Sequence, residues 1–379
     1  MADGRPWRSV ELFSGGGGMA LGLARAGFEH RFLIDWNTHA CATLRANRGM
    51  EWPIRQDDVR AVRWRHMGLD VDLVAGGPPC QPFSIGGKHA GHLDPRDMWP
   101  EAIRAVRELR PRAFLFENVA GLARPAFRGY LRWVLRSLAD PDVEILPDEA
   151  PPDCPGVGEY QVRWFLLDAA DFGAPQRRRR VFIAGVRRSL GVTLEAPTPT
   201  HSRDRLLWDQ WIDGAYWARH GLRVAGREPP RDQIAAVERL SRHALAPPGR
   251  PWRTVRDAIS DLGPPNGVNG HVFQPGARAY PGHTGSRLDE PAKTIKAGDH
   301  GVPGGENMVV LDDGSMRYFT VREAARLQGF PDDWAFAGSW TESMRQIGNA
   351  VPIQLAEAMG RWLRGALDRA ARIDAVPVR

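Results

Sequence analysis

Residues 9–18 read Ser-Val-Glu-Leu-Phe-Ser-Gly-Gly-Gly-Gly, and this stretch decides the fold. Its start, 9–13, predicts a buried strand, and a helical pattern of apolar residues follows the glycines until Gly27. A strand, a glycine turn and a helix in this order are typical of nucleotide-binding α/β folds, because glycine permits a tight turn and a close approach of the backbone to a ligand. We therefore predict an α/β fold with a ligand at this turn.

An acidic residue stands where such a fold needs one. The next predicted strand, 31–34, ends at Asp35, about 20 positions after the glycine turn, where a carboxylate holds a ribose hydroxyl. Trp36 beside it either stacks on an adenine or caps the sheet. Farther on, Asp57 or Asp58 can reach the base of the same ligand, and the sequence does not distinguish them. The alternative is a structural turn followed by surface acids.

A cysteine follows the strand predicted over 71–74. The sequence there is Gly-Gly-Pro-Pro-Cys-Gln, residues 76–81, and the two prolines stiffen the turn because proline fixes φ and lacks an amide donor. Cys80 is therefore a candidate nucleophile at the carboxyl edge of the sheet, where open α/β folds bind their ligands. The alternative is an inert buried cysteine, which is common. Of the other two cysteines, we expect Cys41 in the core and assign no role to Cys154.

Two more segments bring charged side chains to the same edge. The strand predicted over 113–116 ends at Glu117, and burial there would raise the pKa of its carboxyl group toward proton donation. The alternative role for Glu117 is a helix N-cap. Four consecutive arginines enter the strand predicted over 181–186, and we expect Arg178 and Arg180 to share one face because strand residues alternate.

Composition indicates a globular chain of two domains. The 379 residues are 42% hydrophobic and 25% charged, with no apolar run as long as a membrane span and no apolar signal region at the N-terminus. We therefore expect a cytoplasmic protein that does not enter a membrane. The three cysteines form no CxxC pair, which argues against structural zinc and a disulfide framework, so we expect no metal.

The composition changes after residue 186. Residues 187–287 hold fifteen arginines, no lysine and nine acids, an excess of six positive charges that equals the net charge of the whole chain. Arginine suits contacts to phosphate and guanine, so this segment favours a nucleic-acid partner, although genomic composition bias explains the arginines equally well. We expect helices over 231–245 and 254–262, and a last helix over 353–371 whose apolar face packs on the first α/β domain.

These motifs, in this order, resemble those of the DNA (cytosine-5) methyltransferases over nearly the whole chain. The resemblance implies a Rossmann-like domain that binds S-adenosylmethionine, formed by residues 1–186 and completed by 342–379, and a smaller, irregular target-recognition domain over 187–341. The segments 291–295 and 348–351 are similar to the last two sequence blocks of the family. The cofactor-binding positions implied are Phe13, Ser14, Gly15, Gly17, Gly18, Asp35, Trp36, Asp58, Val59, Gly77, Pro79, Asn349 and Val351.

The resemblance also implies a mechanism. Cys80 would attack carbon 6 of a cytosine flipped out of duplex DNA, and Glu117 would protonate ring N3. Arg178 would hold the carbonyl oxygen of the base and help to lower the pKa of the thiol, and Arg180 completes the catalytic set. The implied partners are double-stranded DNA and, acting separately, a restriction endonuclease; we expect a monomer on DNA, associated with the bacterial nucleoid.

Two alternatives remain open at this level. One is an RNA (cytosine-5) methyltransferase of the same fold, since one relative with these motifs acts on transfer RNA; the large basic segment favours DNA. The other is a catalytically silent DNA-binding regulator, against which the intact Cys80, Glu117 and Arg178 argue. The sequence does not give the target site.

Overall fold

The computed structural model describes residues 5–79, 97–145, 158–278, 284–297 and 307–374. Its centre is a seven-stranded sheet in which β7 is antiparallel to both of its neighbours and the other neighbouring pairs are parallel. In spatial order the strands are β3 (Ile54–Gln56), β2 (Phe28–Asp35), β1 (Trp7–Leu12), β4 (Leu73–Gly76), β5 (Ala113–Val119), β7 (Arg179–Arg187) and β6 (Tyr160–Asp168). The strands predicted over 9–13, 31–34, 71–74, 113–116 and 181–186 are confirmed, and the short edge strand β3 was not predicted.

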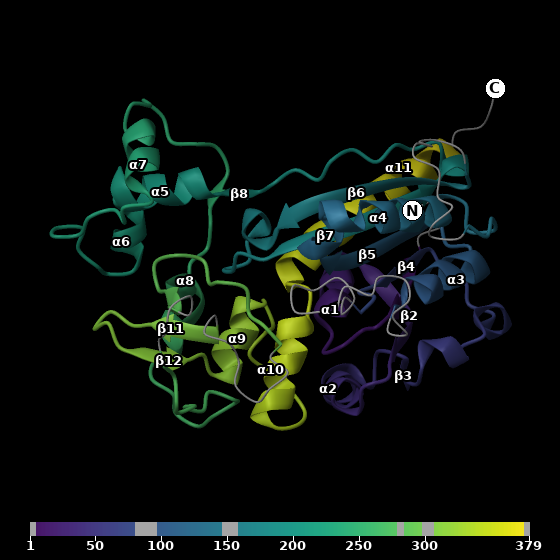
Figure 1. Cartoon of the computed structure of the whole chain (residues 1–379), viewed down its shortest axis with the longest axis horizontal. Helices are drawn as coiled ribbons and strands as arrows, with labels where there is room; N and C mark the ends of the chain where they lie inside the picture. The colour runs from purple at the N-terminus through teal and green to yellow at the C-terminus, as the bar shows by residue number, and fades with distance from the viewer. Residues whose placement is uncertain (1–4, 80–96, 146–157, 279–283, 298–306, 375–379) are drawn as a thin grey trace.

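Helices cover both faces of this sheet (Figure 1). On one face, α3 (Trp99–Leu109) and α4 (Arg128–Ala139) pack Ile103 and Val134 against Val10 of β1. On the other face, α1 (Gly18–Arg25) and α11 (Ile353–Asp374) pack Leu23 and Leu363 against Leu115 of β5. Strands buried on two sides read as continuous apolar runs, which is why β5 begins Ala-Phe-Leu-Phe.

The last helix returns to the first domain, as its apolar face predicted. Its four predicted face residues are fully buried in one cluster with side chains of α1; they are Leu355, Met359, Leu363 and Leu367. The helix α2 (Thr38–Arg48) begins after Asn37, whose side chain accepts a hydrogen bond from the Ala40 amide. The short 3-10 helices are η1 (Val59–Ala61), η2 (Trp64–Met67), η4 (Ala120–Ala123), η5 (Pro125–Phe127), η7 (Ala169–Phe172), η8 (Arg188–Leu190) and η9 (Ser260–Leu262).

Residues 201–252 form a separate group of helices, which we call the helical lobe. It holds α5 (Arg203–Trp211), α6 (Ala215–Arg219) and α7 (Ile234–Leu240), and it is entered and left through the parallel strands β8 (His201–Ser202) and β9 (Arg250–Pro251) (Figure 1). One small core, around Trp208, is made of lobe residues alone, and a second, around Trp217, also includes Ala170 of η7. The helix predicted over 231–245 is present only as α7, and α5 and α6 were not predicted because their apolar residues show no clear period.

The chain between the lobe and α11 packs against the α/β part. It contains α8 (Val255–Ile259), α9 (Val321–Leu327), α10 (Trp340–Asn349) and a three-stranded sheet of β10 (Ser286–Arg287), β11 (Met308–Val310) and β12 (Met316–Tyr318). Val255 and Phe319 share one hydrophobic cluster with Leu33 of β2 and Leu44 of α2. The helix predicted over 254–262 is present as α8 followed by η9. Within the described ranges, no helix combines the length and the apolar composition needed to cross a membrane.

Candidate active site

The glycine turn and the acid after β2 are joined directly. Gly15 lies at φ 53°, and its amide donates to Asp35 Oδ2 at 2.8 Å, while the Asn37 amide donates to Asp35 Oδ1 at the same distance. Ser14 is tied to β2 through its amide and the carbonyl of Ile34, 3.1 Å apart. Burial raises the pKa of Asp35, although these backbone donors act to lower it. The turn and the predicted ribose acid therefore form one unit.

The glycines also permit close packing against the last sequence block. A Cβ at Gly18 would lie 2.5 Å from the carbonyl oxygen of Val351, and one at Gly17 would lie 2.8 Å from the Leu44 side chain. Phe13, which precedes the turn, adopts φ 57°, a left-handed conformation that is uncommon outside glycine. The structure thus brings 13–18 and 348–351 together, with Val351 buried and Asn349 exposed.

The predicted adenine contacts surround a more open region. The Trp36 side chain is 77% exposed directly after Asp35. Asp58 caps η1 by accepting from the Arg60 amide and also pairs with the Arg60 guanidinium, whereas Asp57 pairs with Arg55. Each of the two candidate acids therefore has an ion pair on its own segment. Val59, the next predicted contact, is 6% exposed.

Strands β4 and β5 meet at the edge where the sequence places the nucleophile. Gly76 pairs with Phe116, and a Cβ at Gly77 would lie 3.4 Å from Glu117 Oε2. The Asn118 side-chain amide donates to the carbonyl of Pro78 at 3.1 Å. Cys80 lies outside the described residues, as does Cys154. The chain up to Pro79 is held against the end of β5.

Glu117 is buried beside an arginine. Arg180 Nε lies 2.7 Å from Glu117 Oε1, and the exposed fractions of the two side chains are 12% and 10%. Burial raises the pKa of the Glu117 carboxyl, and the charges of Arg180 and Arg178 oppose this rise. The predicted direction of this pKa shift therefore agrees with the structure. Cys41, the cysteine that the structure does describe, is buried as expected, and burial raises the pKa of its thiol to about 11.

Arg178 contacts backbone groups of distant segments. Its guanidinium is buried and donates to the backbone carbonyls of Ile295, at 2.7 Å, and of Gly348. β7 begins only at Arg179, and the Arg178 amide donates to the Asp168 side chain. Arg180 is thus the arginine that contacts Glu117, and Arg178 joins three distant segments of the chain.

Gln328 also belongs to this junction and was not predicted from the sequence. The Gln328 side chain is fully buried; it accepts from Gln176 Nε2 at 3.1 Å and donates to the carbonyl of Ile347 at 2.6 Å. Gln176 Oε1 in turn accepts from the Ile295 amide at 2.9 Å. The available signal was a glutamine directly after the apolar pattern of α9. Among the residues that can be described, no group of His, Cys, Asp and Glu side chains is arranged to hold a metal ion.

The strand order with an antiparallel β7, the glycine turn bound to an acid, and the buried Glu117 at the same edge define an S-adenosylmethionine-dependent methyltransferase. The family described as C-5 cytosine-specific DNA methylase matches residues 7–210 and 236–364. The chain belongs to this family. It is an enzyme that transfers a methyl group from S-adenosylmethionine to carbon 5 of cytosine in DNA.

Relatives support the same conclusion. The chain is 34% identical over 371 residues to the type II methyltransferase M.NgoMIV of Neisseria gonorrhoeae, covering 95% of this chain and 98% of the relative. It is 33% identical to M.Eco47II of Escherichia coli, covering 95% and 79% of the two chains. A solved DNMT2 structure from Spodoptera frugiperda superimposes with a TM-score of 0.61 at 16% identity, covering 94% and 99%, which bears on the fold alone. DNA methylation is therefore favoured over both alternatives left open by the sequence.

Proposed function

We propose that the reaction proceeds through a covalent bond between Cys80 and carbon 6 of a cytosine that has been flipped out of the duplex. The observation that carries this proposal is the packing of Gly77 and Pro78 against Glu117 and Asn118. Cys80 follows two residues after Pro78, whose carbonyl accepts from Asn118 next to the buried Glu117–Arg180 pair. Ring atoms of a stacked base are out of reach, so the base must leave the helix.

The proposed roles follow from the environment of each group. Cys80 attacks carbon 6 as the thiolate, and Glu117, whose pKa is raised by burial, gives its proton to ring N3. This makes carbon 5 electron-rich, and S-adenosylmethionine supplies the methyl group. Loss of the carbon 5 proton to a base then expels the Cys80 thiolate. Arg180 holds Glu117 and the carbonyl oxygen of the base, while Arg178 supports the site from within the junction.

The cofactor is proposed to lie across the glycine turn. Asp35 accepts hydrogen bonds from the ribose, and Trp36 offers an exposed ring to the adenine. Close packing of Gly18 against Val351 keeps side chains out of this cradle. The remaining proposed contacts are Phe13, Ser14, Gly15, Gly17, Asp58, Val59, Gly77, Pro79 and Asn349.

We further propose that residues 1–186 with 342–379 catalyse the reaction and that 187–341 select the target, with the protein acting as a monomer on DNA. The names of the type II relatives suggest a restriction-modification pair with a separate endonuclease, in the bacterial cytoplasm and associated with the nucleoid. Sequencing genomic DNA for methylated cytosines, after expression in an unmethylated host, identifies the target. Replacing 187–287 by the equivalent segment of a relative is expected to change that target and keep the chemistry. An active chimera that keeps the original target contradicts this assignment.

Trapping tests the covalent step. Replacing the carbon 5 proton of the target cytosine by fluorine blocks the elimination, so the enzyme is expected to stay bonded to DNA in the presence of S-adenosylmethionine. The adduct should survive denaturing electrophoresis and map to the peptide that contains Cys80. Cys80→Ser should not form it, because a hydroxyl is far less ionised than a thiol near neutral pH. An adduct on Cys41 or Cys154, or equal trapping by Cys80→Ser, would overturn the proposal.

A further inference from the structure

A pocket of about 280 Å³ lies where the helical lobe meets the rest of the chain. It is built from strands β8 and β9, the end of α6 and the start of α8. The side chains that line it are His201, Arg219, Arg250, Trp252, Arg253 and Asp257, and we call it the arginine pocket. None of the positions proposed for the cofactor or the target base belongs to it.

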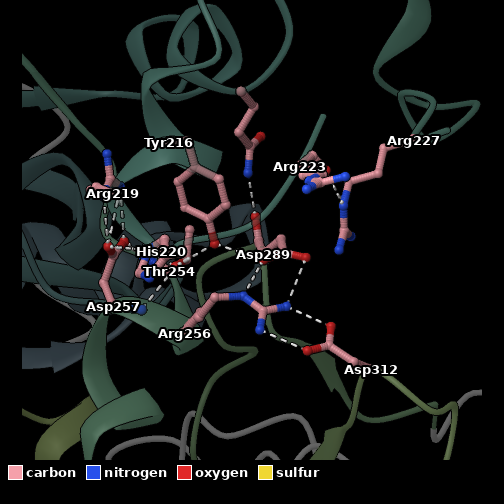
Figure 2. Close-up of polar contacts among 11 residues, drawn as sticks. Tyr216, Arg219, His220, Arg223, Arg227, Thr254, Arg256, Asp257, Asp289 and Asp312 are labelled. Carbon is pink, nitrogen blue, oxygen red and sulfur yellow. Dashed lines mark hydrogen bonds and ion pairs between the residues drawn. The ribbon is translucent and has the colours of Figure 1, made fainter. Parts of the chain in front are cut away.

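The pocket has more positive charge than its acid can balance. Arg250 and Arg253 are both exposed, and neither has a carboxylate within ion-pair distance in the described part of the chain. The single acid in the lining, Asp257, already pairs with Arg219 at 3.1 Å and with His220 Nε2 at 3.0 Å. Figure 2 shows Arg219 and His220 both reaching this carboxylate.

The Asp257 carboxylate also stabilises the first turn of α8. Asp257 accepts from the amide of Thr254 at 2.8 Å and completes the capping box of α8. Burial alone would raise the pKa of Asp257, but the Thr254 hydrogen bond and the Arg219 charge hold it below its ordinary value. Asp257 is therefore ionised and fully engaged, so that the charges of Arg250 and Arg253 are left for a ligand.

His201 forms a neutral wall of the pocket. Its Nδ1 lies 2.9 Å from Thr200 Oγ1, and its ring packs on Gly173, where a Cβ would lie 2.7 Å from the ring. Burial, together with the charges of Arg250 and Arg253, lowers the pKa of His201 to about 4. The ring therefore offers a hydrogen bond near neutral pH without adding a charge.

The pocket borders the segment that carries the catalytic arginine. Trp252 donates from its indole nitrogen to Asp171 Oδ1 at 2.9 Å, which fixes this wall to the chain directly after β6. The guanidinium of Arg177 lies 5.6 Å from the centre of the Trp252 ring. Arg177 is three residues before Arg180, which contacts Glu117. A group held in the pocket thus lies beside the turn that leads to the active site.

We propose that the arginine pocket binds a backbone phosphate of the DNA substrate. Phosphate is a compact anion that guanidinium groups bind through paired hydrogen bonds, and a contact of this kind positions the duplex without reading its sequence. Arg250 and Arg253 bind the phosphate oxygens, and His201 adds a hydrogen bond. The lobe is thereby held to the DNA beside the turn that leads to Arg180.

The test uses the full-length double variant Arg250→Gln/Arg253→Gln and a labelled duplex that contains the methylation site found by sequencing. The slope of log Kd against log salt concentration is expected to fall by about 1 to 2, because fewer counterions are displaced. The ratio of affinities for the target duplex and for a duplex with an altered site should stay the same. Cofactor affinity and melting temperature should also stay the same, which shows that the variant folds.

The matched control is Arg369→Gln/Arg372→Gln, which removes two exposed arginines of α11 that likewise have no carboxylate partner in the described residues. It makes the same change in net charge and should keep the wild-type salt slope. Equal slopes in the pocket variant and the wild type would overturn the proposal. So would a change of target preference, which would make the pocket a base-reading site. If inorganic phosphate raises the melting temperature of the wild type alone while both salt slopes agree, the pocket binds a free anion and not DNA.

Discussion

Arg180 and Glu117 are ion-paired across the antiparallel strands β5 and β7, with Nε and Oε1 2.7 Å apart, while Arg178 donates to two backbone carbonyls at a buried junction. Arg178 and Arg180, two positions apart in the sequence, therefore make different contacts. One acts on the proposed catalytic acid, and the other holds the segments around 295 and 348 in place.

Alanine substitutions of Arg178 and Arg180 should have different effects on kcat and on the free energy of unfolding. Arg180→Ala is expected to lower kcat by about 10²–10³-fold, as for removal of one preorganised donor. Arg178→Ala leaves two buried carbonyls without their donor, and we expect the free energy of unfolding to fall by about 3 kcal/mol. Methyl transfer from labelled cofactor and urea unfolding measure the two effects. The reverse pattern would assign the catalytic role to Arg178.

Methyl transfer should decline on the alkaline side in a way that depends on Glu117. Burial raises the pKa of this carboxyl, and the protonated form is the one that donates to the base. The rate is therefore expected to fall as the pH rises through the raised pKa. Glu117→Gln should lower kcat by about 10²–10⁴-fold and remove this alkaline limb. If Glu117→Gln keeps the decline of the rate at alkaline pH, the decline is caused by the titration of another group.

Asp35 should be needed for cofactor affinity. Its carboxylate accepts from the amides of Gly15 and Asn37, so Asp35→Ala loses both the proposed ribose contact and the order of the turn. We expect S-adenosylmethionine binding to weaken by about 1–3 kcal/mol, measured by calorimetry. Asp35→Asn keeps one acceptor and should lie between the alanine variant and the wild type. Unchanged affinity in Asp35→Ala would remove this residue from the site.

Gly18→Ala should disturb the proposed cofactor site through a steric clash. The new Cβ would lie 2.5 Å from the carbonyl oxygen of Val351, which is backbone and cannot simply turn away. We expect a loss of about 1–3 kcal/mol in the free energy of unfolding and weaker cofactor binding. Gly129→Ala in α4 is the control, because its Cβ would meet nothing within 4 Å, and it should be neutral or stabilising. Equal effects would show that the clash is relieved.

His30 should make stability depend on pH. Its ring is fully buried between Ser9 and the Ala20 carbonyl, and burial lowers its pKa from 6.5 to about 4. Its contribution is present above the unfolded-state pKa and is lost as the pH falls from 6.5 toward 4, about 3 kcal/mol in total. Glu11 is buried with a raised pKa and changes stability in the opposite direction, so the measure is the difference between wild type and His30→Gln. If urea unfolding gives a difference that does not vary with pH, His30 does not titrate as described.

The sequence predicted most of the sheet because each buried strand is a continuous apolar run that ends in Gly, Asp or Glu at the ligand edge. It placed Gly15 and Asp35 at one ligand site for the same reason, but it did not predict the hydrogen bond that joins them. It placed Arg178 and Arg180 at one site, but it could not predict that the Arg178 guanidinium donates to the carbonyls of Ile295 and Gly348, because those residues lie more than 100 positions away in the sequence. It also missed Gln328, whose partners lie far away in the sequence and become neighbours only when the chain is folded.

The pairing of β8 with β9 bears on where the length of this chain can vary in evolution. His201 pairs with Arg250, so the chain leaves for the helical lobe and comes back at one place, and the cluster around Trp208 is made of lobe residues alone. The family match is interrupted over 211–235, inside that excursion. Residues inserted or lost within 211–235 therefore fall between two points of the chain that already lie side by side. We expect relatives to differ in length at this place more readily than in the segments that surround Arg178 and Glu117.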